Sequence, residues 1–417
     1  MAGTFVLNLV QKVLTLAVSV MLARLMGPRN YGVYAAGIAV ITLIGVPASL
    51  GLPTLLVREV SAYHVKQQWA LLKGLLLRSN QSIIAVTLVL GVALLLMQPW
   101  FLRHEGIGLR FLWVAFCLLP LTLFGAMRMA TLRGLHHIVL GQLPEALVAP
   151  AVLLLGIALW AVFEHKAPSP LIAISMRLAG VIVAFAIGAY LLWKRLPQPV
   201  RATKVQYNTR QWAIAAFPLM WVGAVSIAST QIDVVMLAAL KGAADAGIYQ
   251  VAARGAELVG FVYAISTMAL QPTMANLYAS NDLVRLRRVV KHASRIMFAA
   301  SLVAASVFVL AGSTILSSVF GRAFNTGSTP LTILSLGWVL IAALGPARDA
   351  LLMCGGEKTA AILMTIGTVL NVVLNVVLIP RLGTSGAAIA TATSMVVSNY
   401  GYSVAVKRRL GYRVAVI

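Results

Sequence analysis

The sequence predicts an all-α, polytopic membrane protein of about twelve transmembrane helices in two parallel six-helix lobes. Of its 417 residues, 60% are apolar and 10% are charged, whereas soluble globular proteins have about 25% charged residues. Apolar runs near the length of about 20 residues that a membrane span requires follow one another along the whole chain. A stretch in the first half also recurs in the second. Composition, run length and repetition therefore indicate a duplicated membrane protein.

The repeat joins residues 20–34 (VMLARLMGPRNYGVY) to residues 235–249 (VMLAALKGAADAGIY), with eight of fifteen positions identical and no gap. An even number of spans in each half gives both halves the same orientation in the membrane. We therefore expect a pseudo-two-fold axis along the membrane normal, with a cavity between the lobes. This is the architecture of a carrier.

The apolar runs place the elements in order. We expect an N-terminal lobe at residues 1–195, a cytoplasmic linker at 196–211 and a C-terminal lobe at 212–417. The twelve spans are predicted near residues 5–25, 31–52, 79–101, 109–128, 143–163, 171–193, 212–240, 247–277, 294–320, 331–353, 360–379 and 386–406.

The net charge of +23 does not indicate nucleic-acid binding. A nucleic-acid interface would gather basic residues on a soluble face, interleaved with aromatics, but here they concentrate in alternate loops. Lys12, Arg177 and Arg254 are assigned to the interior of spans, and the other basic residues to loops, span ends or the tail. The positive-inside rule then places the protein in the cytoplasmic (inner) membrane with both termini cytoplasmic, and its basic loops against anionic membrane lipids. Because the first run carries Lys12 and leads into the repeat, we expect a retained helix rather than a cleaved signal.

The loops argue against an enzyme. The chain has only ten acidic residues, and the longest predicted outer loops, at 102–108 and 320–330, are short. No HExxH spacing or Walker A sequence is present, so we expect no transition metal, no cofactor and no ATP hydrolysis. Energy would come from ion gradients, the membrane potential or the substrate.

Five stretches in order resemble one family. They are ARLMGPRNYGVY (23–34), LGLPTLLVREV (50–60), IDVVMLAALKGAADAGIYQVAAR (232–254), ALQPTMANLYASND (269–282) and residues 361–392, which contain LNVVLNVVLIPRLGTSGAAIATA. The chain resembles the polysaccharide-transport, or O-antigen and lipid-linked oligosaccharide, flippases of the multidrug/oligosaccharidyl-lipid/polysaccharide flippase superfamily. The resemblance implies movement of a polyprenyl-pyrophosphate oligosaccharide to the outer leaflet during lipopolysaccharide biosynthesis, with glycan-assembly proteins as partners.

The resemblance also implies that functional arginines line the central cavity at Arg24, Arg58 and Arg254. Lys12, on the first span, is a further candidate for substrate binding. The duplicate of Arg24 is Ala239, so the shared scaffold does not require an arginine there. Guanidinium groups match phosphate oxygens bidentately and stay charged, which suits a pyrophosphate headgroup.

Each arginine also has a structural interpretation. Arg24 would anchor the end of its helix at the membrane interface. Arg58, which precedes Glu59, would set topology. Arg254 would form an ion pair with Glu257, one turn away.

A polar cluster is predicted in the second half. Asp233 replaces Val18 of the first copy, and an acid inside a span needs a partner or a proton. Asn371 and Asn375 share a helix face, and Thr391 offers a hydroxyl. The resemblance implies a sodium site at Asp233, Asn371 and Thr391, but a relative has a carboxylate where this chain has Asn375. Sodium, a proton and helix–helix hydrogen bonding all remain open.

These features predict alternating access by rocking of the two lobes, with hinges at helix breaks. The candidate breaks are Pro47, Pro53, Pro218, Pro272 and Pro346. Three other functions compete with the flippase. A cation-coupled drug exporter of the same superfamily would need carboxylates in the first-half cavity, and spans one to four offer none. A membrane-embedded glycan polymerase or ligase and a passive scaffold for glycan assembly are the others.

Overall fold

A computed structural model describes residues 2–103 and 108–411, and regular structure in these ranges is helical throughout. The all-α prediction is confirmed. The chain folds into two compact units. Unit 1 comprises Met1–Met26 and Gly37–Ile227, and unit 2 comprises Gly27–Ala36 and Ala228–Ile417. This division falls inside a helix rather than in the linker expected at 196–211, and the lobe boundaries stay a prediction.

Unit 1 packs around apolar side chains of α2, α3 and α4, which include Leu55, Leu72 and Leu123. The indole of Trp212 on α9 donates a hydrogen bond of 3.0 Å to the Tyr63 hydroxyl on α2. The helices of this unit are α1 (Ala2–Ala48, except its part in unit 2), α2 (Leu52–Val65), α3 (Trp69–Arg103), α4 (Leu109–Gly134), α5 (Ile138–Leu143), the π-helical turn η1 (Pro144–Val148), α6 (Ala149–Phe163), α7 (Pro170–Arg195), α8 (Gln198–Ala202) and the first part of α9 (Thr209–Leu240).

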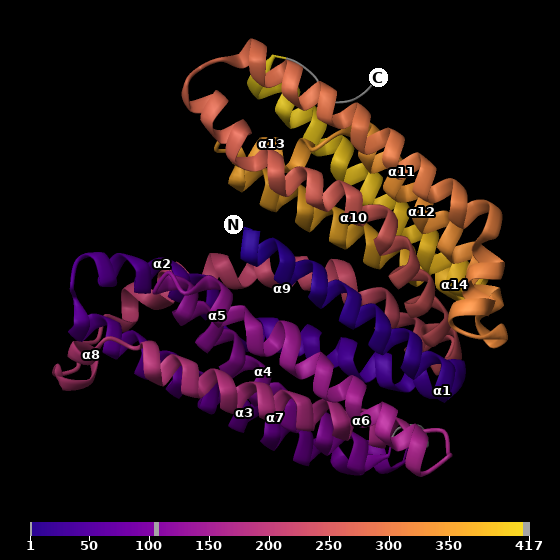
Figure 1. Cartoon of the computed structure of the whole chain (residues 1–417), viewed down its shortest axis with the longest axis horizontal. Helices are drawn as coiled ribbons and strands as arrows, with labels where there is room; N and C mark the ends of the chain where they lie inside the picture. The colour runs from indigo at the N-terminus through magenta and orange to yellow at the C-terminus, as the bar shows by residue number, and fades with distance from the viewer. Residues whose placement is uncertain (1, 104–107, 412–417) are drawn as a thin grey trace. The chain divides into compact units, whose positions relative to one another are not determined.

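In unit 2, α10, α11, α12 and α14 lie side by side and pack on one another (Figure 1). One apolar cluster joins Met274 of α10, Val290 of α11 and Tyr402 of α14. After α9 the elements of this unit are α10 (Ala243–Ala279), α11 (Leu283–Val319), the 3-10 turn η2 (Arg322–Gly327), α12 (Ser328–Leu344), α13 (Ala347–Met353) and α14 (Glu357–Leu410).

In the described ranges, ten helices are long and apolar enough to cross a membrane. Two of them contain a glycine with non-helical backbone angles. Gly27 in α1 has φ 72° and ψ 174°, and Gly383 in α14 has φ 57° and ψ −130°. Counting the two parts of each helix separately gives twelve spans, as predicted. Residues 104–107 of the predicted outer loop and residues 412–417 of the basic tail lie outside the described residues.

The sequence repeat is also a structural repeat. Gly27 and Gly242 occupy equivalent positions in the repeat, and both combine a positive φ with an extended ψ. The angles are φ 72° and ψ 174° at Gly27, and φ 101° and ψ 172° at Gly242. Residues with a Cβ rarely adopt this backbone conformation. Glycine therefore permits the helix to stop and restart in a new direction. Both copies therefore fold as helix, glycine break and helix.

The two copies contact each other within unit 2 through equivalent glycines. A Cβ on Gly32 would lie 1.6 Å from the carbonyl oxygen of Ala243, and a Cβ on Gly247 would lie 2.2 Å from that of Pro28. Pro28 and Ala243 are themselves equivalent in the repeat. Small residues allow the helix backbones to approach this closely. The close approach explains why Gly27–Ala36 belongs with unit 2.

Helix breaks differ from the proline-based prediction. Pro218 and Pro272 lie inside the continuous helices α9 and α10. The breaks occur instead at residues with positive φ, including Gly51 and Gly345. Pro53 and Pro346 follow these two glycines closely, and Pro47 lies in the last turn of α1. A left-handed residue redirects the chain more sharply than the loss of one helical hydrogen bond at proline.

Replacing Gly32 by alanine is expected to lower the thermal unfolding midpoint in detergent. A methyl group cannot occupy space 1.6 Å from a backbone oxygen, so the helices must separate. Overpacking of this kind costs about 1–3 kcal/mol. The matched control is Gly45→Ala on the same helix, whose Cβ would lie 3.4 Å from Leu119. An equal midpoint for both variants would contradict the close approach.

Candidate functional site

Asp233 lies at the centre of a buried polar cluster, with 3% of its surface exposed. One carboxylate oxygen accepts hydrogen bonds from the amides of Asn375 at 2.6 Å and Asn371 at 3.1 Å. The other accepts from the hydroxyls of Thr391 at 2.5 Å and Tyr249 at 2.9 Å. The structure therefore brings together all four predicted ion-site residues and adds a fifth.

Tyr249 is the member that sequence reasoning missed. It is 3% exposed, on α10, and its hydroxyl also lies 3.1 Å from that of Thr391. Tyr249 is the last residue of the repeat, sixteen positions after Asp233 and beyond the break at Gly242. The sequence did contain a signal for Tyr249: it carries a hydroxyl and lies on α10, the helix that directly follows α9, which carries Asp233.

The break at Gly383 makes the cluster possible. It divides α14 into an arm that carries Asn371 and Asn375 and an arm that carries Thr391. The two arms pack closely beyond the break, because a Cβ on Gly386 would lie 2.4 Å from the carbonyl oxygen of Leu378. The amide nitrogen of Asn371 thus lies 3.3 Å from the hydroxyl of Thr391, although the two residues are twenty positions apart in the sequence.

The cluster has the oxygen donors that an alkali cation requires. Asn375 is fully buried, and its amide oxygen has no hydrogen-bond partner in the described part of the chain. Buried acceptors are almost always satisfied, so an orphaned one points to a missing partner. A half-turn of either asparagine amide exchanges its NH2 group for its oxygen. The cluster thus contains one carboxylate, two amide side chains and two hydroxyls, and oxygen ligands of these kinds suit a hard cation.

The predicted cationic residues are distributed over both units. Lys12 and Arg24 are exposed on α1 of unit 1. Arg58, also exposed, forms hydrogen bonds of 3.0 Å and 2.9 Å with the carboxylate of its neighbour Glu59. The cavity that would unite these residues with Arg254 of unit 2 stays a prediction.

Arg254 forms the ion pair with Glu257 that the sequence suggested. One of its terminal nitrogens lies 3.2 Å and 3.1 Å from the two carboxylate oxygens. The Nε of Arg254 is buried and has no hydrogen-bond partner in the described residues. Its charge is therefore compensated while one donor remains available.

A further charge pair, in which Arg128 is buried and Glu145 is partly exposed, was not predicted. Arg128 is 4% exposed inside α4, and it donates one hydrogen bond to Glu145 and another, of 3.0 Å, to the carbonyl oxygen of Ala184. The expectation that only three basic residues lie within spans is therefore wrong. The prediction ended the fourth span at Arg128, whereas α4 continues to Gly134.

Local structure makes room for this pair. Pro144 lacks a backbone N–H, and the helix widens there into a π-helical turn that carries Glu145. A Cβ on Gly188 would lie 1.0 Å from the Arg128 guanidinium, and a Cβ on Gly125 would lie 2.8 Å from the Glu145 carboxylate. Two glycines thus form the socket for two charges.

The sequence profile of the polysaccharide biosynthesis protein family matches residues 2–278. The chain belongs to this family. The MatE family profile matches residues 218–377 of this family member. A search of curated protein sequences found no match to this chain.

Solved structures show that the family member has the fold of transporters of the MOP superfamily. An inward-facing multidrug resistance MATE transporter matches with a TM-score of 0.78 at 16% identity, over 96% of this chain and 94% of the other. The lipid II flippase MurJ, inward closed, matches with a TM-score of 0.76 at 15% identity, over 97% and 87%. A MOP transporter from Pyrococcus furiosus matches with a TM-score of 0.66 at 14% identity, over 98% and 94%.

Removing one member of the Arg128–Glu145 pair is expected to destabilise this family member more than removing both. Glu145→Leu leaves a buried guanidinium uncompensated, which costs about 3–5 kcal/mol, whereas the double variant Arg128→Met, Glu145→Leu is expected to recover most of that loss. The measurement is the unfolding midpoint in detergent. The control is the pair Arg58–Glu59, in which the arginine is exposed rather than buried, so that its variants should change stability by less than about 1 kcal/mol. Additive losses at Arg128 and Glu145 would show that the pair is not coupled.

Proposed function

We propose that this protein flips a polyprenyl-pyrophosphate-linked oligosaccharide from the cytoplasmic to the outer leaflet, coupled to a cation at the Asp233 cluster. The family match over residues 2–278 and the fold shared with a lipid II flippase support the reaction class. The observation that carries the coupling is the buried carboxylate on which four polar side chains converge. In this proposal the protein is a transporter of the inner membrane, with both termini cytoplasmic, rather than an enzyme.

Sodium is the cation that we propose. The groups of the cluster that could coordinate a cation are all oxygens, and the amide oxygen of Asn375 lacks a partner among the described residues. Asn375 supplies no second negative charge, so Asp233 alone would balance one monovalent ion. The competing occupant is a proton on Asp233.

The headgroup would be held by Arg24, Arg58 and Arg254, with Lys12 as a further cation. Two of these arginines already have a carboxylate partner on their own helix, Glu59 and Glu257. We propose that these glutamates neutralise the arginines when no substrate is bound, and that pyrophosphate replaces them. Such an exchange keeps each guanidinium compensated, so it avoids the cost of an unpaired charge in a low-dielectric site.

The membrane potential favours this cycle. Each charge that crosses 100 mV gains about 2.3 kcal/mol, so two uncompensated phosphate charges moving outward gain about 4.6 kcal/mol. If the arginines neutralise the headgroup, the outward movement of the substrate-bound protein carries little net charge. The membrane potential then acts mainly on the return of the empty protein, in which the cationic site moves toward the negative interior. A cation released inward from Asp233 would assist that return.

A cation-coupled drug exporter is the second candidate, favoured by the MatE match and by the MATE transporter fold. It requires an acidic site for cationic cargo in the first half. Among the described residues of unit 1, Glu145 is paired with Arg128, and Glu59 with Arg58. Glycan extension or transfer by the purified protein would favour a polymerase or ligase, and a wild-type phenotype of the double variant Arg24→Ala, Arg58→Ala would favour a passive scaffold for glycan assembly.

Sodium is expected to raise the unfolding midpoint of the purified protein, and Asp233→Asn is expected to abolish this effect. Binding to the folded state alone adds about 2.7 kcal/mol at a hundredfold excess over Kd. Asn375→Asp adds a second carboxylate and should strengthen the response. The measurement compares NaCl with KCl at constant ionic strength and at two pH values.

Ser398→Ala is the matched control, since the hydroxyl of this serine donates to the backbone of Ser394 within α14 and lies outside the cluster. It should keep the wild-type response to sodium. A midpoint that depends on pH but equally on both salts would favour the proton. Insensitivity to salt and pH in wild type and Asp233→Asn alike would leave hydrogen bonding between helices as the role of the cluster.

Native mass spectrometry of the mildly solubilised protein from its own host tests the cargo. We expect a co-purifying polyprenyl-pyrophosphate glycan in wild type and its loss in the triple variant Arg24→Ala, Arg58→Ala, Arg254→Ala. A control triple variant replaces three basic residues of α11, Arg285, Arg287 and Arg288, and should retain the lipid. Equal retention in all three proteins would overturn the cationic site. Absence of such a lipid from wild type would favour the drug exporter, and glycan extension or transfer by the purified protein would favour an enzyme.

A further inference from the structure

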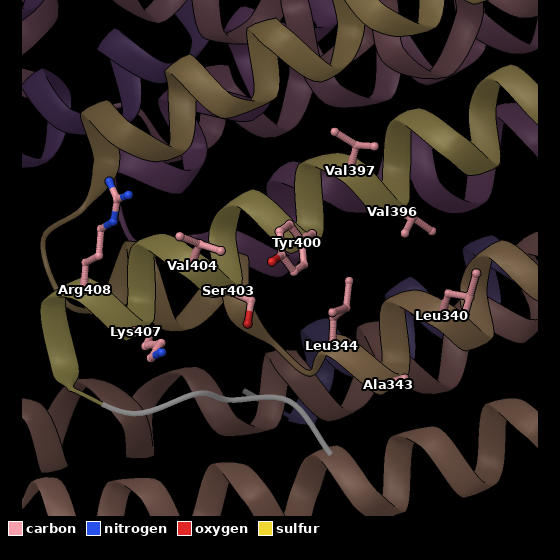
Figure 2. Close-up of a pocket in the computed structure, with 10 residues that line it drawn as sticks. All are labelled: Leu340, Ala343, Leu344, Val396, Val397, Tyr400, Ser403, Val404, Lys407 and Arg408. Atoms are coloured by element: carbon pink, nitrogen blue, oxygen red, sulfur yellow. The ribbon is translucent and has the colours of Figure 1, made fainter. Parts of the chain in front are cut away.

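A groove lies between α12 and α14 in unit 2, with a volume of ≈ 830 Å³. One end of the groove is aliphatic: Leu340 and Leu344 of α12 line it together with Val396 and Val397 of α14, and Val396 points toward Leu340 (Figure 2). All four side chains are at least partly exposed: Leu340 is 52% exposed and Val397 45%, and Leu344 and Val396 are intermediate. Apolar side chains exposed in this way are suited to contact lipid hydrocarbon.

The shape of the groove follows from unequal helix lengths. α12 ends at Leu344, because Gly345 has φ 74° and ψ −177° and the chain restarts as α13 at Ala347. α14 continues to Leu410. The last turns of α14 thus extend past the end of their neighbour.

The chemistry of the α14 wall changes along its length. After the valines come Tyr400 and Ser403, and then Lys407 and Arg408 at the end nearest the last turn of α14 (Figure 2). These positions recur every three or four residues, so they form one stripe of the helix. From Val396 to Lys407 the helix rises about 16 Å at 1.5 Å per residue. That length matches the hydrocarbon depth of one leaflet, about 15 Å.

The cations of this stripe have no carboxylate partner in the part of the chain that the structure describes. Within the same residues, neither Lys407 nor Arg408 forms an ion pair, and both are exposed. The Ser403 side chain is 5% exposed and lines the groove beside them. Two hydroxyls and two cations stand where the apolar groove ends, which is the order of groups that complements a lipid with an anionic headgroup.

We propose that this groove binds an anionic phospholipid, with one acyl chain between α12 and α14 and the phosphate at Lys407 and Arg408. The apolar walls exclude water from the chain, and the two cations favour a negative over a zwitterionic headgroup. The hydroxyls of Ser403 and Tyr400 are placed to donate to phosphate or ester oxygens. This lipid is distinct from the transported substrate, and its site lies wholly within unit 2.

The test is native mass spectrometry of the delipidated full-length protein, titrated with phosphatidylglycerol or with phosphatidylcholine of the same acyl chains. Wild type is expected to bind phosphatidylglycerol on the order of tenfold more tightly. The variant Lys407→Gln, Arg408→Gln should reduce this preference to near equality. Arg409→Gln is the matched control, because Arg409 occupies the same last turn but does not line the groove.

A second variant tests the acyl-chain site separately from the charge. Ala343→Phe places a ring between the groove walls and should weaken both lipids by a similar factor, with an unchanged unfolding midpoint. Equal affinity of wild type for the two lipids would overturn the proposal. So would the same loss of preference in Arg409→Gln as in the double variant, because net charge rather than the groove would then explain binding.

Discussion

The cost of burying one carboxylate organises unit 2. Asp233 is almost completely enclosed, and an isolated charge in such a place is expensive unless donors surround it. Four side chains supply those donors, from α10 and from both arms of α14. Satisfying one acid therefore ties together three helices and both sides of a break. In the proposed function, neutralising this charge by a cation or a proton would change the hydrogen bonds that join these helices.

Glycine provides the geometry that this arrangement needs. Gly27 and Gly242 stop equivalent helices with the same backbone conformation, and Gly383 folds α14 back so that its arms share the Asp233 cluster. Gly32 and Gly247 then allow the duplicated segments to touch through their backbones. The two copies thus keep the glycines that set the backbone conformation, while their other side chains differ. Val18 of the first copy is buried and apolar where the second copy has its acid.

Sequence reasoning recovered the elements of this site that are encoded locally. Asn371 and Asn375 are four residues apart on a helix, so their shared face followed from periodicity, and the structure shows them bonded at 3.1 Å. The comparison of repeat copies singled out Asp233. Neither helical periodicity nor comparison of the repeat copies predicts the pairing of Arg128 with Glu145. Their spans were predicted, but the π-helical turn at Pro144 and the glycine sockets that bring the charges together have no periodic signature.

Hydrophobic run length, duplication and loop charge by themselves determined the all-α membrane architecture and its twelve spans, because the bilayer imposes a length and a polarity on each segment that crosses it. Tertiary structure alone decided which polar side chains meet. It added Tyr249 to the Asp233 cluster, paired Arg128 with Glu145 and opened the groove beside Lys407. These arrangements depend on where helices break and how closely they pack. Positive φ angles at Gly27 and Gly383 produce the breaks in α1 and α14, and such angles do not follow from the pattern of apolar and polar residues.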